Sequence, residues 1–114
     1  MEKVNNKNGI DFYYEIDKEQ NRFVIYDSSE NYFNDLCLEQ EDYDTDFKAL
    51  IKMVENTDLN EMCAFFGHKI YDTWQELVKE QELENEYDED NILDNDYVNR
   101  FVVKDKVYYV FDWR

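Results

Sequence analysis

The side chains in this chain that could do chemistry are mostly carboxylates, and they gather in two runs. The first run extends from Glu80 to Asp96 and holds nine carboxylates and no basic residue. The second extends from Asp27 to Asp46 and holds eight, again with no basic residue. Together they contain 17 of the 29 acidic residues, so the acidity is concentrated rather than evenly spread.

A calcium loop is the first chemistry that such carboxylates suggest. The segment Asp42–Asp46 has carboxylates at its first, third and fifth positions, as an EF-hand loop requires. Its sixth position is Phe47 where glycine is needed, and its twelfth is Met53 where a bidentate Glu belongs. A stretch that begins at Asp88 also lacks the glycine and has Ile92 at its fifth position. We therefore predict no dedicated metal site and no cofactor.

The remaining reactive side chains carry no catalytic pattern. His68 is the single histidine and has no zinc-ligand spacing to either cysteine. Cys37 and Cys63 both stand among apolar neighbours, which is typical of reduced core thiols, with a disulfide between them as the alternative. The chain has no Gly-rich phosphate loop and no nucleophile elbow. We expect a surface or capping role for His68 and no enzymatic activity.

Composition indicates one folded domain over residues 1–114. Apolar residues make up 43% and aromatic residues 18% of the chain, which is too much for a disordered acidic tail. The net charge of −17 far exceeds the roughly 2 to 8 that solubility needs. This charge repels nucleic acids and anionic membranes and attracts a basic partner. The first residues lack a signal-peptide core, so we expect a cytoplasmic protein that binds neither membrane nor nucleic acid directly.

The elements that position the acidic runs begin with a β-hairpin over Ile10–Tyr26. Ile10, Phe12, Tyr14 and Ile16 alternate on one face, with Phe23 and Ile25 on the returning strand. The opposite face carries Tyr13, Val24 and Tyr26, which leaves two alternatives: it is covered, or it offers aromatic rings to a partner. The apolar residues of the next segment, Asn31–Leu38, fit neither the strand nor the helix period well, which leaves a third strand and a short helical turn as alternatives.

Helices are predicted in the middle of the chain. Apolar residues at helical spacing from Phe47 to Val54 indicate the first, starting near Thr45. Asp58 and Glu61 have capping-box spacing for a second helix, which Gly67 is placed to end. We expect a third helix from Lys69 to about Glu84.

A second hairpin closes the chain, with strands over Val98–Val103 and Lys106–Trp113. The predicted fold is therefore α+β: an antiparallel sheet from the N- and C-terminal β-hairpins, with two or three central helices packed on one face.

The acidic runs then predict a surface that imitates nucleic acid. Carboxylates one helical turn apart repeat at about 5.4 Å, and duplex phosphates at about 3.4 Å along each strand. Such a surface competes with nucleic acid for a basic channel, and electrostatic steering speeds its association. The residues expected to form it are Glu80, Glu82, Glu84, Glu86, Tyr87, Asp88, Glu89, Asp90, Asp94 and Asp96 from the first run, and Asp42, Asp44 and Asp46 from the second.

In size, charge and mixed α/β patterning the chain resembles small, strongly acidic phage proteins that inhibit CRISPR effectors or restriction enzymes. The resemblance lies in the two acidic runs and the compact body, and it implies a non-enzymatic inhibitor that occupies a nucleic-acid-binding surface. Two alternatives stay open. One is an immunity protein or antitoxin that neutralises a basic nuclease toxin, and the other is an acidic Ca²⁺-binding accessory domain.

Overall fold

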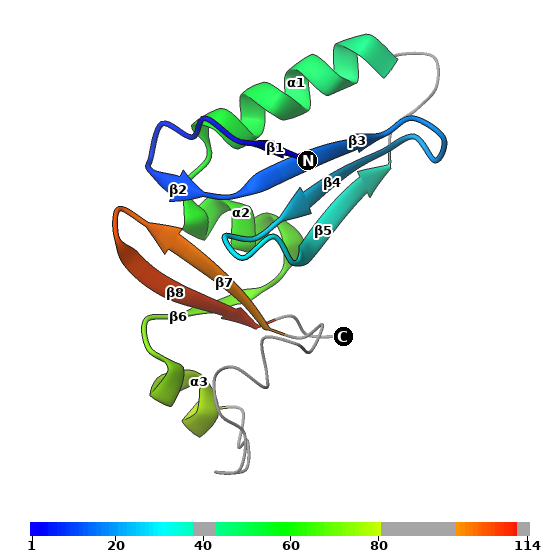
Figure 1. Ribbon diagram of the computed structural model, residues 1–114. Coiled ribbons are helices and arrows are strands. Elements are labelled where there is room, and N and C mark those ends of the chain that lie inside the picture. The colour runs from blue at the N-terminus through cyan, green and yellow to red at the C-terminus, as the bar shows by residue number, and fades with distance from the viewer. Residues whose placement is uncertain (38–42, 81–97, 112–114) are drawn as a thin grey trace.

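The fold consists of two antiparallel sheets and three helices, which confirms the predicted α+β class (Figure 1). The structure, a computed structural model, describes residues 1–37, 43–80 and 98–111. The first sheet has the order β1 (Glu2–Lys3), β3 (Tyr13–Asp17), β4 (Arg22–Tyr26) and β5 (Tyr32–Cys37). The second has the order β2 (Ile10–Asp11), β7 (Val98–Val103), β8 (Lys106–Phe111) and β6 (Lys69–Tyr71). The helices are α1 (Tyr43–Asn56), α2 (Leu59–Phe66) and α3 (Trp74–Glu80).

Both terminal hairpins are confirmed, but they lie in two sheets joined through β2 rather than in one. On one side of Phe12, Ile10 of β2 pairs with Val103 of β7; on the other side, Tyr14 of β3 pairs with Ile25 of β4. The first predicted strand is thus divided at Phe12 between the two sheets. The Phe12 side chain is completely buried, so the point of division is also a centre of the core.

The main core lies between the two sheets and the first two helices. Alternate residues of a strand face opposite sides, and the inward rows of the first sheet supply Phe23 and Ile25. Phe101 of β7 reaches the same core from the second sheet, and Phe47 and Val54 reach it from α1. Burying each such phenylalanine stabilises the fold by about 1.5–3 kcal/mol. The apolar stripe predicted for the first helix therefore faces the core as expected.

A smaller core lies on the other face of the second sheet. It contains Tyr71, Leu77, Val98 and Tyr109, and the Trp74 ring meets the Tyr109 ring edge-on with centroids 5.6 Å apart. The second sheet is thus buried on both faces where α3 covers it. Of the described helices, α1 and α2 lie on the first sheet, whereas α3 packs near β6 and β8 (Figure 1).

Predicted caps define the ends of α2. The Asp58 carboxylate accepts a 2.8 Å hydrogen bond from the Glu61 N–H at its start. At its end Gly67 takes a left-handed conformation with φ 76°, and the His68 N–H donates to the Cys63 carbonyl. This pattern satisfies carbonyls that the last helical turn leaves without partners.

The third helix begins later than the sequence predicts. Residues Lys69–Tyr71 form β6, because Ile70 and Tyr71 pair with Val110 and Tyr109 of β8. The helix starts at Trp74. The preceding residue, Thr73, caps it, because the Thr73 hydroxyl accepts a 3.2 Å hydrogen bond from the Glu76 N–H. The predicted continuation of this helix beyond Glu80, over residues 81–84, lies outside the described residues.

Two other predicted segments take definite forms. Of the two alternatives for Asn31–Leu38, the structure contains the strand, β5, on the edge of the first sheet. The turn between β7 and β8 is formed by Lys104 and Asp105 with φ of 48° and 71°. Positive φ at both central positions matches the twist of a tight hairpin, here without the usual glycine.

Candidate partner-binding surface

Of the residues expected to bind a partner, Glu80 is the one whose side chain the structure describes. It is the last residue of α3 and is exposed. Asp44 and Asp46 lie in the first turn of α1, but their side chains are not among those described. The others lie outside the described residues, so the structure does not place them relative to Glu80: Asp42, Glu82, Glu84, Glu86, Tyr87, Asp88, Glu89, Asp90, Asp94 and Asp96.

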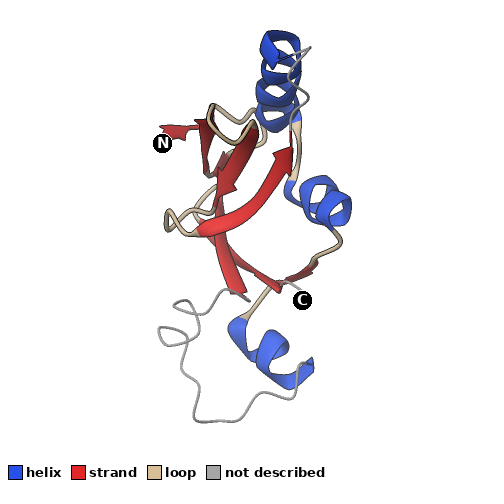
Figure 2. Cartoon of the chain, turned by 90° about the vertical axis from the view of Figure 1, so that its right-hand side faces the viewer, coloured by secondary structure: helices blue, strands red, loops and turns tan. Residues whose placement is uncertain are grey.

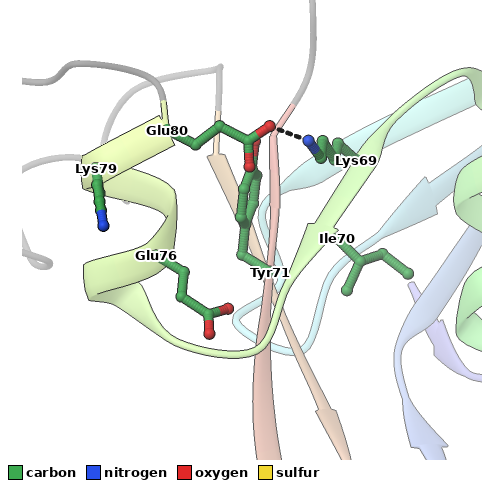
Figure 3. Close-up of a pocket in the computed structure, with 6 residues that line it drawn as sticks. All are labelled: Lys69, Ile70, Tyr71, Glu76, Lys79 and Glu80. Carbon is green, nitrogen blue, oxygen red and sulfur yellow. Dashed lines mark hydrogen bonds and ion pairs between the residues drawn. The ribbon is translucent and has the colours of Figure 1, made fainter.

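Glu80 borders a shallow hollow between β6 and α3 (Figure 3). The Lys69 ammonium donates a hydrogen bond to the Glu80 carboxylate, and this contact raises the pKa of Lys69 above its ordinary value. Glu76 and Lys79 add one further charge of each sign. The described part of the hollow is therefore balanced in charge, and Glu80 does not present an uncompensated negative charge there.

Asp27, the first residue of the second acidic run, is buried rather than presented at the surface. One carboxylate oxygen accepts hydrogen bonds from the N–H groups of Ser29 and Asn31, at 2.9 and 3.0 Å. The other accepts from the Asn99 amide and the Arg100 N–H, at 2.9 and 3.1 Å. Burial raises the pKa of Asp27, and these hydrogen bonds partly oppose the rise. Asp-Ser-Ser directly after a strand is typical of an Asp whose side chain accepts hydrogen bonds from the backbone N–H groups that follow it. This pattern could have identified Asp27 as a structural residue from the sequence.

The first sheet has one face that no described helix covers. Figure 2 shows α1 and α2 on the other side of this sheet. We call the uncovered side the open face. By strand register and alternation it comprises Lys3, Tyr13, Glu15, Asp17, Arg22, Val24, Tyr26, Tyr32, Asp35 and Cys37.

Three tyrosines form a row across the open face. Tyr26 on β4 stands directly opposite Tyr13 on β3 and directly opposite Tyr32 on β5. Side chains at such positions have Cβ atoms about 4.5–5.5 Å apart. Tyr32 is 40% exposed and the other two are half-buried. The sequence identified Tyr13 and Tyr26 as facing away from the core, but missed Tyr32 because an irregularity in β5 shifts the register.

Carboxylates form the neighbouring row of the open face. Glu15 stands opposite Val24, which stands opposite Asp35. The Tyr26 hydroxyl donates a 2.8 Å hydrogen bond to Glu15, and Arg22 pairs with Asp35 at 2.9 Å. Burial first, and then this bond to Glu15, raise the pKa of Tyr26 to about 12. The phenol is therefore neutral and anchored at physiological pH.

The other reactive side chains differ in their surroundings. Cys63 is buried in the main core, and burial raises the pKa of its thiol to about 12. Cys37 is exposed at the end of β5, so the expectation of a core thiol is wrong for it, because the strand turns this side chain away from the core. Both thiols are free, and the alternative disulfide is absent.

His68 is half-buried, directly after the left-handed cap. Its Nε2 forms a hydrogen bond with the Asn34 amide, and its ring meets the Phe33 ring with centroids 5.2 Å apart. It is therefore held by the inner side of the first sheet rather than lying on an open surface. No cluster of three or more metal-ligating side chains occurs among the described residues. Within the same ranges, no helix is both long and apolar enough to cross a membrane.

Comparison of the chain with protein-family models, with curated proteins and with solved structures finds no match in any of the three.

Proposed function

We propose that the protein is a non-enzymatic inhibitor that binds a basic nucleic-acid-binding protein and competes with its nucleic acid. A CRISPR effector or another phage-defence nuclease is the partner class that the size, charge and α/β build favour. The expected contact residues are those predicted from the sequence: the acidic residues and Tyr87 of Glu80–Asp96, together with Asp42, Asp44 and Asp46.

The observation that carries this proposal is where the described carboxylates lie. Among them Asp27 alone is buried, and every other described acidic side chain is half-buried or exposed. The described carboxylates thus lie largely at the surface of a body with an aromatic core. Because like charges repel and lower the stability of a compact state, such a surface needs a reason other than folding.

The distribution of the remaining charge points the same way. The two acidic runs hold 17 acidic residues and no basic residue, whereas the rest of the chain holds 12 of each. Several of the described cations are in ion pairs, such as Lys3 with Asp11 at 2.8 Å. The strongest excess of negative charge is therefore local, which is what imitation of a phosphate backbone requires.

The first test identifies the partner and then asks whether the inhibitor competes with the DNA that this partner binds. Tagged protein is used to capture partners from cells that contain CRISPR and restriction systems, and a retained nuclease is assayed with the inhibitor added before or after target DNA. Competition predicts strong inhibition when the inhibitor is added first and weak inhibition when DNA is already bound. Equal potency in both orders would show that direct competition is the wrong mechanism.

The second test locates the contact. Charge reversal of Glu82, Glu84, Glu86 and Asp88 to Lys is compared with a control that reverses four exposed acids outside both runs: Glu2, Glu19, Glu61 and Asp72. Both variants change the net charge equally. We expect the first to weaken partner binding by far more than the control, with thermal stability unchanged or raised. Equal weakening would show that total charge, rather than this run, determines binding.

A further inference from the structure

We infer that the open face of the first sheet docks an arginine-rich segment of the protein partner, with guanidinium groups stacked on the row Tyr13, Tyr26 and Tyr32. This inference rests on the proposed function, because it names a second contact with the same basic partner. It concerns the folded sheet and involves no residue of the first acidic run.

The first argument is the placement of the rings. A solvated sheet face normally carries polar side chains, whereas this one has tyrosines at three directly adjacent positions on β3, β4 and β5. Tyrosine gives a large contact area with little rotamer freedom to lose and is enriched at protein interfaces. No helix among the described residues lies over these rings (Figure 2).

The second argument is charge complementarity. Glu15, Asp17 and Asp35 share the open face with two cations, and both cations are already in ion pairs. Arg22 pairs with Asp35 at 2.9 Å, and Lys3 pairs with Asp11 at 2.8 Å. A carboxylate offers about four lone-pair positions, so Glu15 has acceptor capacity beyond the bond from Tyr26. A planar cation suits this arrangement, because it can stack on the tyrosine rings and donate hydrogen bonds in its own plane to the neighbouring carboxylates.

These two features select arginine over lysine. A guanidinium stacks on aromatic faces and donates in a planar fork, whereas an ammonium is a compact and strongly hydrated point charge. Cation–π contacts are worth about 0.5–2 kcal/mol, depending on desolvation. The hydrogen bond from Tyr26 to Glu15 fixes the central ring and the carboxylate relative to each other before any partner arrives.

The experiment uses short oligo-arginine and oligo-lysine peptides of equal length as probes for the full chain. Binding is measured by fluorescence anisotropy and by NMR of the tyrosine rings. We expect the arginine peptide to bind several-fold more tightly and to shift the rings of Tyr13 and Tyr32. In the double variant Tyr13→Lys with Tyr32→Lys, affinity for the arginine peptide should fall about tenfold, and the preference over lysine should disappear.

A matched control adds the same charge on the opposite side of the molecule. Asn60→Lys with Ala64→Lys places two lysines at exposed positions of α2. It should keep the arginine preference even if both peptides bind somewhat more weakly. The single variant Tyr32→Lys, at the most exposed ring of the row, serves if the double variant unfolds.

The outcomes separate this inference from the proposed function. An unchanged arginine preference in the folded tyrosine variants, or ring shifts caused by a single-stranded oligonucleotide instead, would overturn the docking site. Neither result would bear on competition between the acidic runs and DNA. Conversely, loss of the preference in a protein that inhibits no nuclease would leave the docking site standing and refute the function.

Discussion

Asp27, in the loop between β4 and β5, accepts a 2.9 Å hydrogen bond from Asn99 of β7 and so ties the first sheet to the second. The same Asn99 amide donates to the Tyr32 carbonyl at 2.9 Å. Next to Asp27, the Ser28 hydroxyl accepts a 2.7 Å hydrogen bond from the Val102 N–H, also in β7. These hydrogen bonds form a polar junction that fixes how the two sheets meet. Asp27 therefore has a structural role there and is not a partner-binding residue.

Replacing Asp27 with Ala should destabilise the protein by about 3 kcal/mol, because several buried N–H donors would lose their acceptor. Chemical denaturation measures this change in the free energy of unfolding. The matched control is Asp72→Ala, which removes an exposed carboxylate that pairs with Lys106 at 3.5 Å. The control should change stability by no more than about 0.5 kcal/mol. Equal effects for the two variants would contradict the role assigned to the junction.

The two thiols should differ sharply in reactivity. The thiolate is the reactive form of cysteine. The Cys63 side chain is 1% exposed, and burial raises the pKa of its thiol to about 12, so little thiolate forms there. Cys37 is exposed. In the native protein we expect one thiol to react rapidly with a disulfide reagent and the second to react only on unfolding. Cys37→Ser should remove the rapid phase; if it persisted in that variant, the assignment of Cys63 as the protected thiol would be wrong.

Alkaline pH should destabilise the protein through Tyr26. Its pKa is raised from 10.0 to about 12, chiefly by burial and then by the hydrogen bond to Glu15. The folded protein therefore holds this proton more tightly than the unfolded chain does. Its contribution to stability is complete below pH 10.0 and is lost as the pH rises towards 12.

NMR titration of the Tyr26 ring carbon measures this pKa directly. The variant Glu15→Gln should lower it, though not fully to 10.0, because burial is the larger cause. Tyr26→Phe should make the loss of stability over the same pH range shallower. A native midpoint near 10.0 would disprove the shift.

Gly67→Ala should destabilise the protein by about 1 kcal/mol through the backbone alone. Gly67 has φ 76°, and an added Cβ would meet no atom within 4 Å. Gly67→Asn is the control, because asparagine tolerates the left-handed region better than alanine does. Thermal and chemical denaturation should therefore rank the three proteins glycine, asparagine and alanine in decreasing stability. Equal stability of the alanine variant would show that the cap does not require this conformation.

Local patterns predicted the elements that carry their own signals. The helical stripe of α1, the Asp58 and Gly67 caps of α2 and both hairpins follow from residues close together in sequence. The wrong predictions occur where pairing with a strand far away in the sequence determines the secondary structure. Ile70 and Tyr71 fit a helical face as well as a strand, and pairing with β8 makes them strand. Likewise, β7 captures Ile10 and divides the first predicted strand at Phe12.

The candidate site was harder to predict than the fold. Charge density identified the acidic runs, yet it could not distinguish a presented carboxylate from Asp27, whose partners lie as far away as β7. Alternation alone could not identify the complete tyrosine row either. Counting alternate residues along β5 places Tyr32 on the core side, but a bulge shifts the register and puts it on the open face. Each of these facts depends on the pairing of segments far apart in the chain.

The pairing of β2 with β7 also constrains when the protein can finish folding. Ile10 meets Val103, and the Asn6 amide donates to the Val54 and Thr57 carbonyls at the end of α1. During synthesis, the segments of the first sheet and α1 are made before β7 and β8, the two central strands of the second sheet. Contacts of such long sequence separation slow folding. Until β7 has been synthesised, Ile10 lacks the strand with which it pairs, so the second sheet is the last part of the fold that can form.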